Sequence, residues 1–260
     1  MGSALVRGMI ASGLTTGDRI TISAKTPDSA KAKASTLGVN HADSNEDAIR
    51  HAEIVFLCVK PAQATAVVSS VASELDGKLL ISIVAAIPCE ELFQASGGRA
   101  RVIRSMPNTA VRLRKGITAL SRHHSCNDQD MKTATAIFSS VGSALIVREE
   151  DLDTVTAVSG SGPAFALLML EAMAQGGVDG GLDPEMAKIF AAGALAAAAS
   201  LVIETGETPL ALRDEITSPA GTTASGLEVL NKEGFPRIVR DSVRAARARS
   251  IELSKPRQDP

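Results

Sequence analysis

Short apolar runs alternate with amphipathic helical segments through the first part of the chain. The runs are rich in Val, Ile and Leu and nearly continuous, which is typical of parallel strands that are covered on both faces. The predicted strands are residues 19–23, 54–59, 79–84, 102–106, 117–120 and 144–147. The pattern therefore predicts an α/β fold, with a doubly wound Rossmann-like domain over residues 1–150.

After residue 150 the apolar runs give way to helical periodicity. Several of the helical segments begin at or near a proline, which is favoured in a first helical turn. We therefore expect residues 151–260 to form an all-helical domain. Residues 189–201 are dominated by Ala, Leu and Gly on every face, so we expect this helix to be buried at a subunit interface. The predicted helices are residues 163–175, 184–204, 209–216, 223–232 and 236–254.

The chain opens on Met1-Gly2-Ser3, and an amphipathic helix that carries Leu5 and Met9 follows at once. In a dinucleotide-binding fold this order of elements follows the first strand, which is central in the sheet, and its glycine loop. We therefore expect that strand to be missing ahead of Met1. Its loss would leave two neighbouring strands with unpaired edges and would weaken pyrophosphate binding.

The composition restricts the class of protein. The chain has 260 residues, a net charge of −2 and a pI near 6.1, which give no basic surface for nucleic acid. We find no apolar run long enough to cross a bilayer and expect no membrane span. The three cysteines have neither CxxC spacing nor an even count, which argues against a zinc knuckle or a disulfide framework and favours a reducing cytoplasm. They are Cys58, Cys89 and Cys126.

The lack of Tyr and the positions of the histidines limit which residues could act as a general acid or base. The chain has no Tyr, so a tyrosine cannot act as a general acid. All of its histidines precede residue 125 and stand in polar segments, so we interpret them as surface residues and expect no metal site. These histidines are His41, His51, His123 and His124.

The end of the first predicted strand indicates which dinucleotide would bind. Ser23, Lys25 and Thr26 follow that strand, and no acidic residue occurs before Asp28. A basic residue at this place pairs with a 2′-phosphate, whereas an acidic one would bind a free 2′-hydroxyl. The residues favour NADP(H). A polar turn with a Ser or Thr helix cap is an equally good interpretation of these residues alone.

Three predicted strands end in a residue followed by proline, at Lys60-Pro61, Ile87-Pro88 and Met106-Pro107. Proline cannot continue a strand ladder, so the backbone leaves the sheet at the carboxyl ends of the strands, where ligands bind in such folds. We expect these ends to line a crevice for the cofactor. The candidate cofactor residues are Met1, Gly2, Ser23, Lys25, Thr26, Asn45, Cys58, Val59, Lys60, Pro61, Ala85, Ala86, Pro107 and Asn108.

Four motifs together resemble the pyrroline-5-carboxylate reductase family. They are Val59-Lys60-Pro61, Arg104-Ser105-Met106-Pro107-Asn108-Thr109, Ala157-Val158-Ser159-Gly160-Ser161-Gly162-Pro163-Ala164 and Thr217-Ser218-Pro219-Ala220-Gly221-Thr222-Thr223. The resemblance covers nearly the whole chain. It implies an oxidoreductase that uses NADP(H), with NAD(H) as the second choice, to reduce 1-pyrroline-5-carboxylate to L-proline in the last step of proline biosynthesis. It also implies a homodimer joined through the helical domain, which in this family often assembles into a decamer.

The last of these motifs precedes a predicted helix and could receive a carboxylate. Backbone N–H groups and hydroxyls at a helix N-terminus bind anions, and the resemblance places the substrate carboxylate on Ser218, Gly221, Thr222 and Thr223. Thr223 Oγ would then hydrogen-bond the ring nitrogen, so Thr223 and Ser218 are the candidate catalytic residues. An ordinary helix cap after a Pro-containing turn explains the loop equally well.

The sequence also departs from the family pattern. Ala86 and Ala220 stand where the family has glycine, and a positive φ at residue 220 would cost about 1 kcal/mol. A catalytically impaired NADP-binding homologue or scaffold is the alternative function, because of the missing strand. A β-hydroxyacid dehydrogenase is disfavoured, because Ala166 stands where that group has its catalytic lysine.

Overall fold

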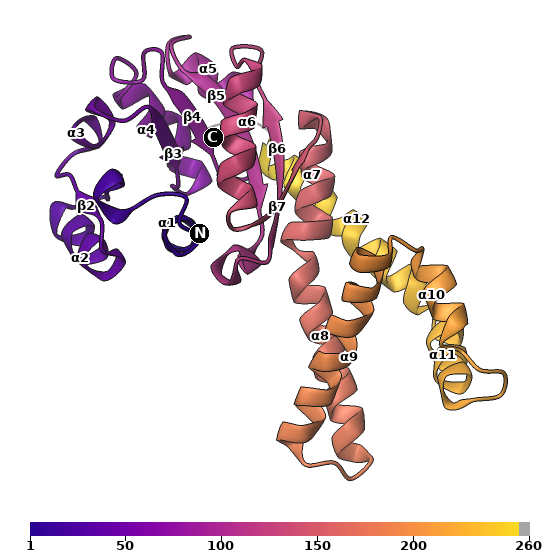
Figure 1. Cartoon of the computed structure of the whole chain (residues 1–260). Coiled ribbons are helices and arrows are strands. Elements are labelled where there is room, and N and C mark those ends of the chain that lie inside the picture. The colour runs from indigo at the N-terminus through magenta and orange to yellow at the C-terminus, as the bar shows by residue number, and fades with distance from the viewer. Residues whose placement is uncertain (255–260) are drawn as a thin grey trace. The chain divides into compact units, whose positions relative to one another are not determined.

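The computed structural model describes residues 1–254 and divides the chain into two compact units. Unit 1 consists of Met1–Gly160 together with the chain from Ala246, and unit 2 consists of Ser161–Ala245. Among the described residues, every strand belongs to unit 1, and unit 2 contains only helices (Figure 1). Helix α12 (Phe235–Ser254) begins in unit 2 and ends in unit 1.

The main sheet of unit 1 has the spatial order β3-β4-β5-β6-β7. Strands β3, β4 and β5 are parallel to one another, β6 is antiparallel to β5, and β7 is parallel to β6. The expectation of parallel strands is therefore wrong for the β5–β6 pair, since apolar character does not encode the direction of a strand. The bounds are β3 (Ile54–Leu57), β4 (Leu79–Ser82), β5 (Arg101–Pro107), β6 (Gly116–Arg122) and β7 (Gly142–Ile146).

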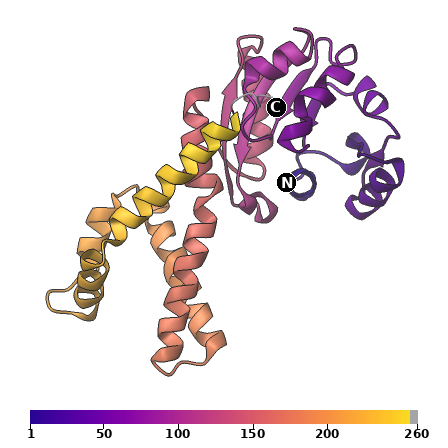
Figure 2. The same ribbon diagram turned by 180° about the vertical axis from the view of Figure 1, so that it is seen from behind.

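A second, two-stranded sheet lies beside α2 and apart from the main sheet in both views (Figures 1 and 2). It pairs β1 (Thr21–Ile22) with β2 (Asn40–His41) in parallel. In the part of the chain that the structure describes, strand β1 is bonded to β2 alone and β3 to β4 alone, so each keeps one unpaired edge. Although β3 is entirely apolar, only Leu57 in it is buried, whereas every residue of β4 is buried.

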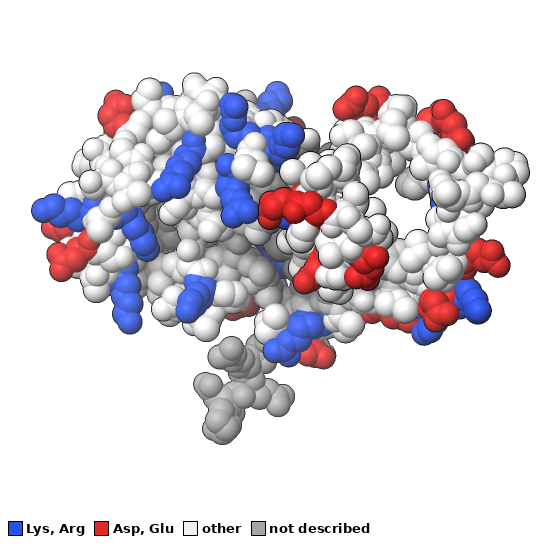
Figure 3. Space-filling model, turned by 90° about the horizontal axis from the view of Figure 1, so that it is seen from below, with Lys and Arg blue, Asp and Glu red and all other residues white. Residues whose placement is uncertain are grey.

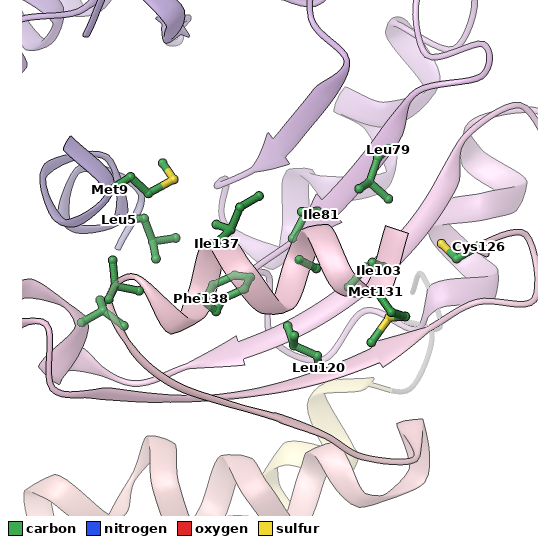
Figure 4. Close-up of a cluster of buried hydrophobic side chains, with 13 residues drawn as sticks. Leu5, Met9, Leu79, Ile81, Ile103, Leu120, Cys126, Met131, Ile137 and Phe138 are labelled. Atoms are coloured by element: carbon green, nitrogen blue, oxygen red, sulfur yellow. The ribbon is translucent and has the colours of Figure 1, made fainter. Parts of the chain in front are cut away.

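Helices cover both faces of the main sheet, as the doubly wound fold requires. Alternate residues of a strand point to opposite faces. Leu79 and Ile81 of β4 accordingly belong to a core with Leu5 of α1 and Phe138 of α6 (Figure 4). Leu80 of β4 belongs to a second core, which contains residues of α3, α4 and α5. Each fully buried Leu or Ile contributes about 1.5–3 kcal/mol.

The helices of unit 1 are short apart from α1, α2 and α6. Their bounds are α1 (Gly2–Ala11), α2 (Pro27–Leu37), α3 (Asn45–Arg50), α4 (Ala64–Ser70), α5 (Cys89–Ala95), α6 (Asp128–Ser139) and α7 (Leu152–Val155). Single 3₁₀ turns connect them at η1 (Gly17–Arg19), η2 (Pro61–Gln63), η3 (Thr109–Leu113) and η4 (Glu149–Asp151), and η5 (Thr156–Gly160) is a π-helix.

Unit 2 is built on two long helices, α8 (Gly162–Asp179) and α9 (Pro184–Thr205), which pack side by side. Gly177 permits the close approach, because a Cβ there would lie 3.2 Å from Cβ of Ala187. Two shorter helices, α10 (Pro209–Glu215) and α11 (Thr222–Lys232), follow before α12 begins.

The long helices of unit 2 expose most of their apolar side chains. No residue of α8 is buried, and Leu168 of α8 and Phe190 of α9 are 68% and 61% exposed. The segments Glu149–Asp179 and Pro184–Thr205 are long and apolar enough to cross a membrane by length and composition. The expectation that no apolar run has that length is therefore wrong. In Pro184–Thr205 much of the apolar length comes from Ala, which does not form a conspicuous run of large residues.

Candidate active site

The three X-Pro turns lie at one edge of the main sheet. Strands β3, β4 and β5 are adjacent and parallel, so their carboxyl ends meet there. Pro61 opens η2 directly after β3, Pro88 is the N-cap of α5 after β4, and Pro107 is the last residue of β5. Ligands bind at this edge in open α/β sheets.

The start of α1 lies against the end of β3. A Cβ on Gly2 would lie 3.1 Å from both Cβ and Sγ of Cys58, so a side chain at residue 2 would displace Cys58. Met1 is the N-cap of α1 and provides no side-chain hydrogen bond to the first turn. The first-turn N–H groups of this ten-residue helix therefore have no side-chain acceptor, and a helix N-terminus of this kind favours an anion.

Two of the predicted cofactor residues contact each other at the end of β1. Ser23 Oγ donates a hydrogen bond of 2.8 Å to Oδ1 of Asn45, which is the first residue of α3. Lys25 is exposed beside them. Thr26 Oγ1 accepts a hydrogen bond of 3.3 Å from the Ser29 N–H and so caps α2. A helix cap was the alternative interpretation of this residue in the sequence.

The loops after β4 and β5 have distinct roles. Ala86 is buried and has a φ of +69°, so the chain turns sharply after β4 in a conformation that favours glycine. Asn108 Oδ1 accepts hydrogen bonds from the N–H groups of Ala110 and Ile117, at 3.2 and 3.3 Å. This side chain therefore fixes η3 against the start of β6.

An ion pair between a buried Arg104 and a half-buried Glu149, which the sequence did not indicate, holds the start of α5. Glu149 Oε1 accepts hydrogen bonds from the Cys89 N–H at 2.6 Å and from Nη1 of Arg104 at 3.3 Å. The Arg104 side chain on β5 is only 8% exposed. Glu149 lies 60 residues after Cys89 in the chain, and no local pattern links the two. The pair ties the loop that contains Ala86 to η4.

The π-helix η5 is a second feature that the sequence did not indicate. A Cβ on Gly160 would lie 2.7 Å from Cε of Met106, so η5 packs directly on the end of β5. Within the described residues, Ser159 Oγ is one of the buried side-chain atoms without a hydrogen-bond partner. Single π-turns are frequent at functional sites. The only sequence signal was the run Gly160-Ser161-Gly162.

The loop before α11 presents backbone N–H groups at a helix N-terminus. Gly221 is the N-cap and adds no side-chain bond, and Thr222 and Thr223 begin the helix. A Cβ on Gly221 would lie 2.3 Å from Ser218 Oγ, so the Ser218 hydroxyl lies directly beside the first turn. Ala220 has a φ of +58°. Its backbone therefore has the positive φ whose cost was considered from the sequence. Ser218, Thr222 and Thr223 are exposed.

The charge distribution agrees with an anionic cofactor. Seen from below the view of Figure 1, the side of unit 1 shows many Lys and Arg side chains and few acidic ones (Figure 3). Lys25 and Lys60 are both exposed. Positive charge at a crevice raises the local concentration of a phosphate-bearing ligand.

His123 is buried, although it was expected at the surface. His123 is only 6% exposed, so its interpretation as a surface residue is wrong. Its ring packs on Phe93 with a centroid distance of 4.4 Å, and its two nitrogen atoms are paired with Ser125 and Glu90. These contacts satisfy the polar atoms of the ring and allow it to be buried.

Comparison with known proteins identifies the family. The family model described as pyrroline-5-carboxylate reductase dimerisation matches residues 149–253, and the one described as NADP oxidoreductase, coenzyme F420-dependent, matches residues 1–86. The pyrroline-5-carboxylate reductases of Escherichia coli K12 and Methanosarcina acetivorans are 35% and 38% identical to this chain. Each match spans 256 residues, which are 98% of this chain and 95% of the relative. The chain belongs to the pyrroline-5-carboxylate reductase family.

Solved structures agree with this assignment. The pyrroline carboxylate reductase of Plasmodium falciparum with NADP bound has a TM-score of 0.87 at 30% identity, and that of Coxiella burnetii has a TM-score of 0.90 at 29% identity. Both cover 98% of this chain and 95% of their own. The Rossmann-like fold followed by a helical dimerisation domain is therefore confirmed, as is the resemblance that the motifs suggested. The family excludes the β-hydroxyacid dehydrogenase alternative.

Proposed function

We propose that this protein is an NADPH-dependent pyrroline-5-carboxylate reductase that converts 1-pyrroline-5-carboxylate to L-proline, the last step of proline biosynthesis. Residues 1–150 would bind the cofactor, and residues 151–260 would bind the substrate and form the dimer. The observation that carries the proposal is the N-terminus of α11. There Gly221 leaves room for the Ser218 hydroxyl beside uncapped N–H groups, an arrangement that suits a small carboxylate.

The residues of unit 1 fit a dinucleotide. Gly2 brings the uncapped start of α1 against Cys58 at the end of β3, where a pyrophosphate would accept hydrogen bonds from the helix N–H groups. Lys25 would pair with a 2′-phosphate, and the nearby Ser23 and Asn45 are bonded to each other. NADPH, when bound, supplies a hydride; NAD(H) lacks the 2′-phosphate and would bind more weakly.

The residues of unit 2 would orient the substrate. The N–H groups of Thr222 and Thr223 and the Ser218 hydroxyl hold the carboxylate, and Thr223 Oγ accepts a hydrogen bond from the protonated ring nitrogen. Protonation makes the imine carbon electrophilic, so these residues would present that carbon to a hydride donor, and reduction of the C=N bond would need no proton transfer in the same step. Because positioning then provides most of the rate, no His or Tyr acid is required.

The helical domain would form a homodimer in the cytoplasm, not a membrane anchor. The dimerisation model covers both apolar helices of unit 2, and their exposed residues, such as Leu168 and Phe190, need a partner surface. The family resemblance implies that such dimers often assemble into decamers, and we propose a decamer for this protein.

Turnover tests the function. The chain should oxidise NADPH when 1-pyrroline-5-carboxylate is added and produce proline in equal amount. Thr223→Ala should lower kcat about tenfold or more with a smaller change in KM, because the lost bond is to a charged nitrogen. Ser218→Ala is the matched control and should chiefly raise KM. Equal activity of Thr223→Ala with hydride transfer rate-limiting, shown by a deuterated cofactor, would exclude Thr223 from the chemical step.

The divided sheet favours a second candidate, a catalytically impaired NADP-binding protein. Strands β1 and β3 each keep an unpaired edge beside the proposed cofactor residues. Tight binding of NADPH without proline formation would support this alternative, and turnover would exclude it.

A further inference from the structure

We propose that Glu90, His123 and His124 form a binding site for a divalent transition-metal ion of the Zn²⁺ type. The three side chains come from the first turn of α5 and from the residues after β6, and one ligand atom from each lies within 4.8 Å of the others. They belong to neither the proposed cofactor site nor the carboxylate site. Imidazole and carboxylate together are a donor set that suits Zn²⁺, Ni²⁺ and Cu²⁺.

The spacing needs only a small side-chain adjustment. In a tetrahedral site with metal–ligand bonds of about 2.0–2.1 Å, neighbouring ligand atoms are roughly 3.4 Å apart. His123 Nε2 and Glu90 Oε2 are already 2.9 Å apart. Because Glu90 and His124 are exposed, their side chains can move by the remaining distance without disturbing the core. A water molecule would complete the fourth position.

Ser125 fixes the His123 ring. Its Nδ1 lies 3.0 Å from Ser125 Oγ, and that oxygen is itself fixed by the Val102 N–H of β5 at 3.3 Å. The Ser125 N–H also donates to Nδ1, at 3.3 Å. With a metal on Nε2, Nδ1 would carry the proton and donate to Ser125 Oγ in place of that bond. The ring also packs against both Phe93 and His124, with centroid distances of 4.4 and 3.8 Å.

Glu90 is held from the other side of the cluster. Gln94 Nε2 donates a bond of 2.7 Å to Glu90 Oε1, which leaves Oε2 directed at His123. A bound ion would connect α5 to the segment after β6 and stabilise unit 1 by mass action.

The test is Zn²⁺ binding to the full chain, made without a histidine tag and treated with a chelator beforehand. Calorimetric titration should show one equivalent, and Zn²⁺ should raise the thermal midpoint. His124→Ala and Glu90→Gln change exposed residues, so both variants should fold, and each should weaken binding about tenfold or more. His51→Ala, at an exposed histidine elsewhere, is the control and should bind as the unmodified chain does.

Cobalt distinguishes the proposed ligands from the cysteines. Co²⁺ bound to His and Glu gives visible d–d bands without the sulfur charge-transfer band that a cysteine ligand adds. The proposal is overturned if the chain binds no Zn²⁺, if His124→Ala and Glu90→Gln bind as tightly as His51→Ala, or if the sulfur band appears.

Discussion

Ala220 is the exposed residue at which the loop before α11 stores backbone strain. Its φ is +58°, in the left-handed region, where a residue with a Cβ is about 1–2 kcal/mol less stable than in the right-handed region. Glycine removes this cost but gains about 0.4–1 kcal/mol of conformational freedom in the unfolded chain. Because Ala220 is exposed, its methyl group adds little packing. We expect Ala220→Gly to raise the free energy of unfolding by about 0.5–1 kcal/mol.

Ala86 provides an internal comparison. It has a similar φ of +69° but is only 3% exposed. Loss of a buried methyl group costs about 0.8 kcal/mol, which cancels most of the relief of strain. We therefore expect Ala86→Gly to be nearly neutral, and the difference between the two variants to reflect burial alone.

Urea unfolding followed by circular dichroism measures these effects. All variants must be compared at one protein concentration, since association of subunits adds to the apparent stability. The control is Ala224→Gly within α11, where Gly replaces Ala at a helical φ and should lower the free energy of unfolding by about 1 kcal/mol. If Ala220→Gly destabilises the protein as Ala224→Gly does, residue 220 is not left-handed in solution and the strain argument fails.

Three other expectations concern the cofactor and the assembly. Lys25→Ala should weaken NADPH binding and leave NADH binding unchanged. A charge-assisted bond is worth about 1.5–3 kcal/mol, so the preference for NADPH over NADH should fall about tenfold or more. Equal weakening of both cofactors would remove Lys25 from the site. Ala194 is exposed in the single chain, so Ala194→Glu would harm a monomer little but should dissociate a dimer in sedimentation. A folded monomer of the unmodified chain would contradict the proposed interface. Desolvation raises the pKa of the Cys58 thiol to about 11 although the residue reaches the surface. Since the thiolate reacts, alkylation should rise about tenfold per pH unit below that pKa, and NADPH should slow it; no protection would place the cofactor elsewhere.

Hydrophobic patterning predicted most elements because burial and periodicity are linked. The main-sheet strands and the helices of unit 2 were found within a few residues of their bounds. Strand β2 was missed, since Asn40 and His41 are polar and exposed and pair with β1 only through the backbone. The antiparallel direction of β6 was missed for the same reason, because hydrogen bonds that set direction leave no trace in side-chain polarity.

Some residues of the candidate site were predictable from the sequence and others were not. Glycine and proline positions were informative, because Gly2 and Gly221 stand where a Cβ would collide with Cys58 and Ser218. Contacts between distant polar residues were not predictable. Glu149 meets Cys89, and Glu90 meets His123, across 60 and 33 residues. Such pairs depend on the tertiary fold, which a single sequence does not encode locally.

The helices differ in whether a side-chain oxygen caps the first turn. Side-chain oxygens cap the first turns of α2, α3, α6, α9 and α10, and they belong to Thr26, Ser44, Asn127, Asp183 and Thr208. Helices α1 and α11 begin without such a cap, after Met1 and Gly221, as do α4, α5, α7 and α8. N–H groups at a helix start require an acceptor, and α1 and α11 are the uncapped helices whose first turns carry proposed cofactor and substrate residues. A pyrophosphate on α1 and a carboxylate on α11 are the two anions that an NADPH-dependent reductase of an imino acid must bind.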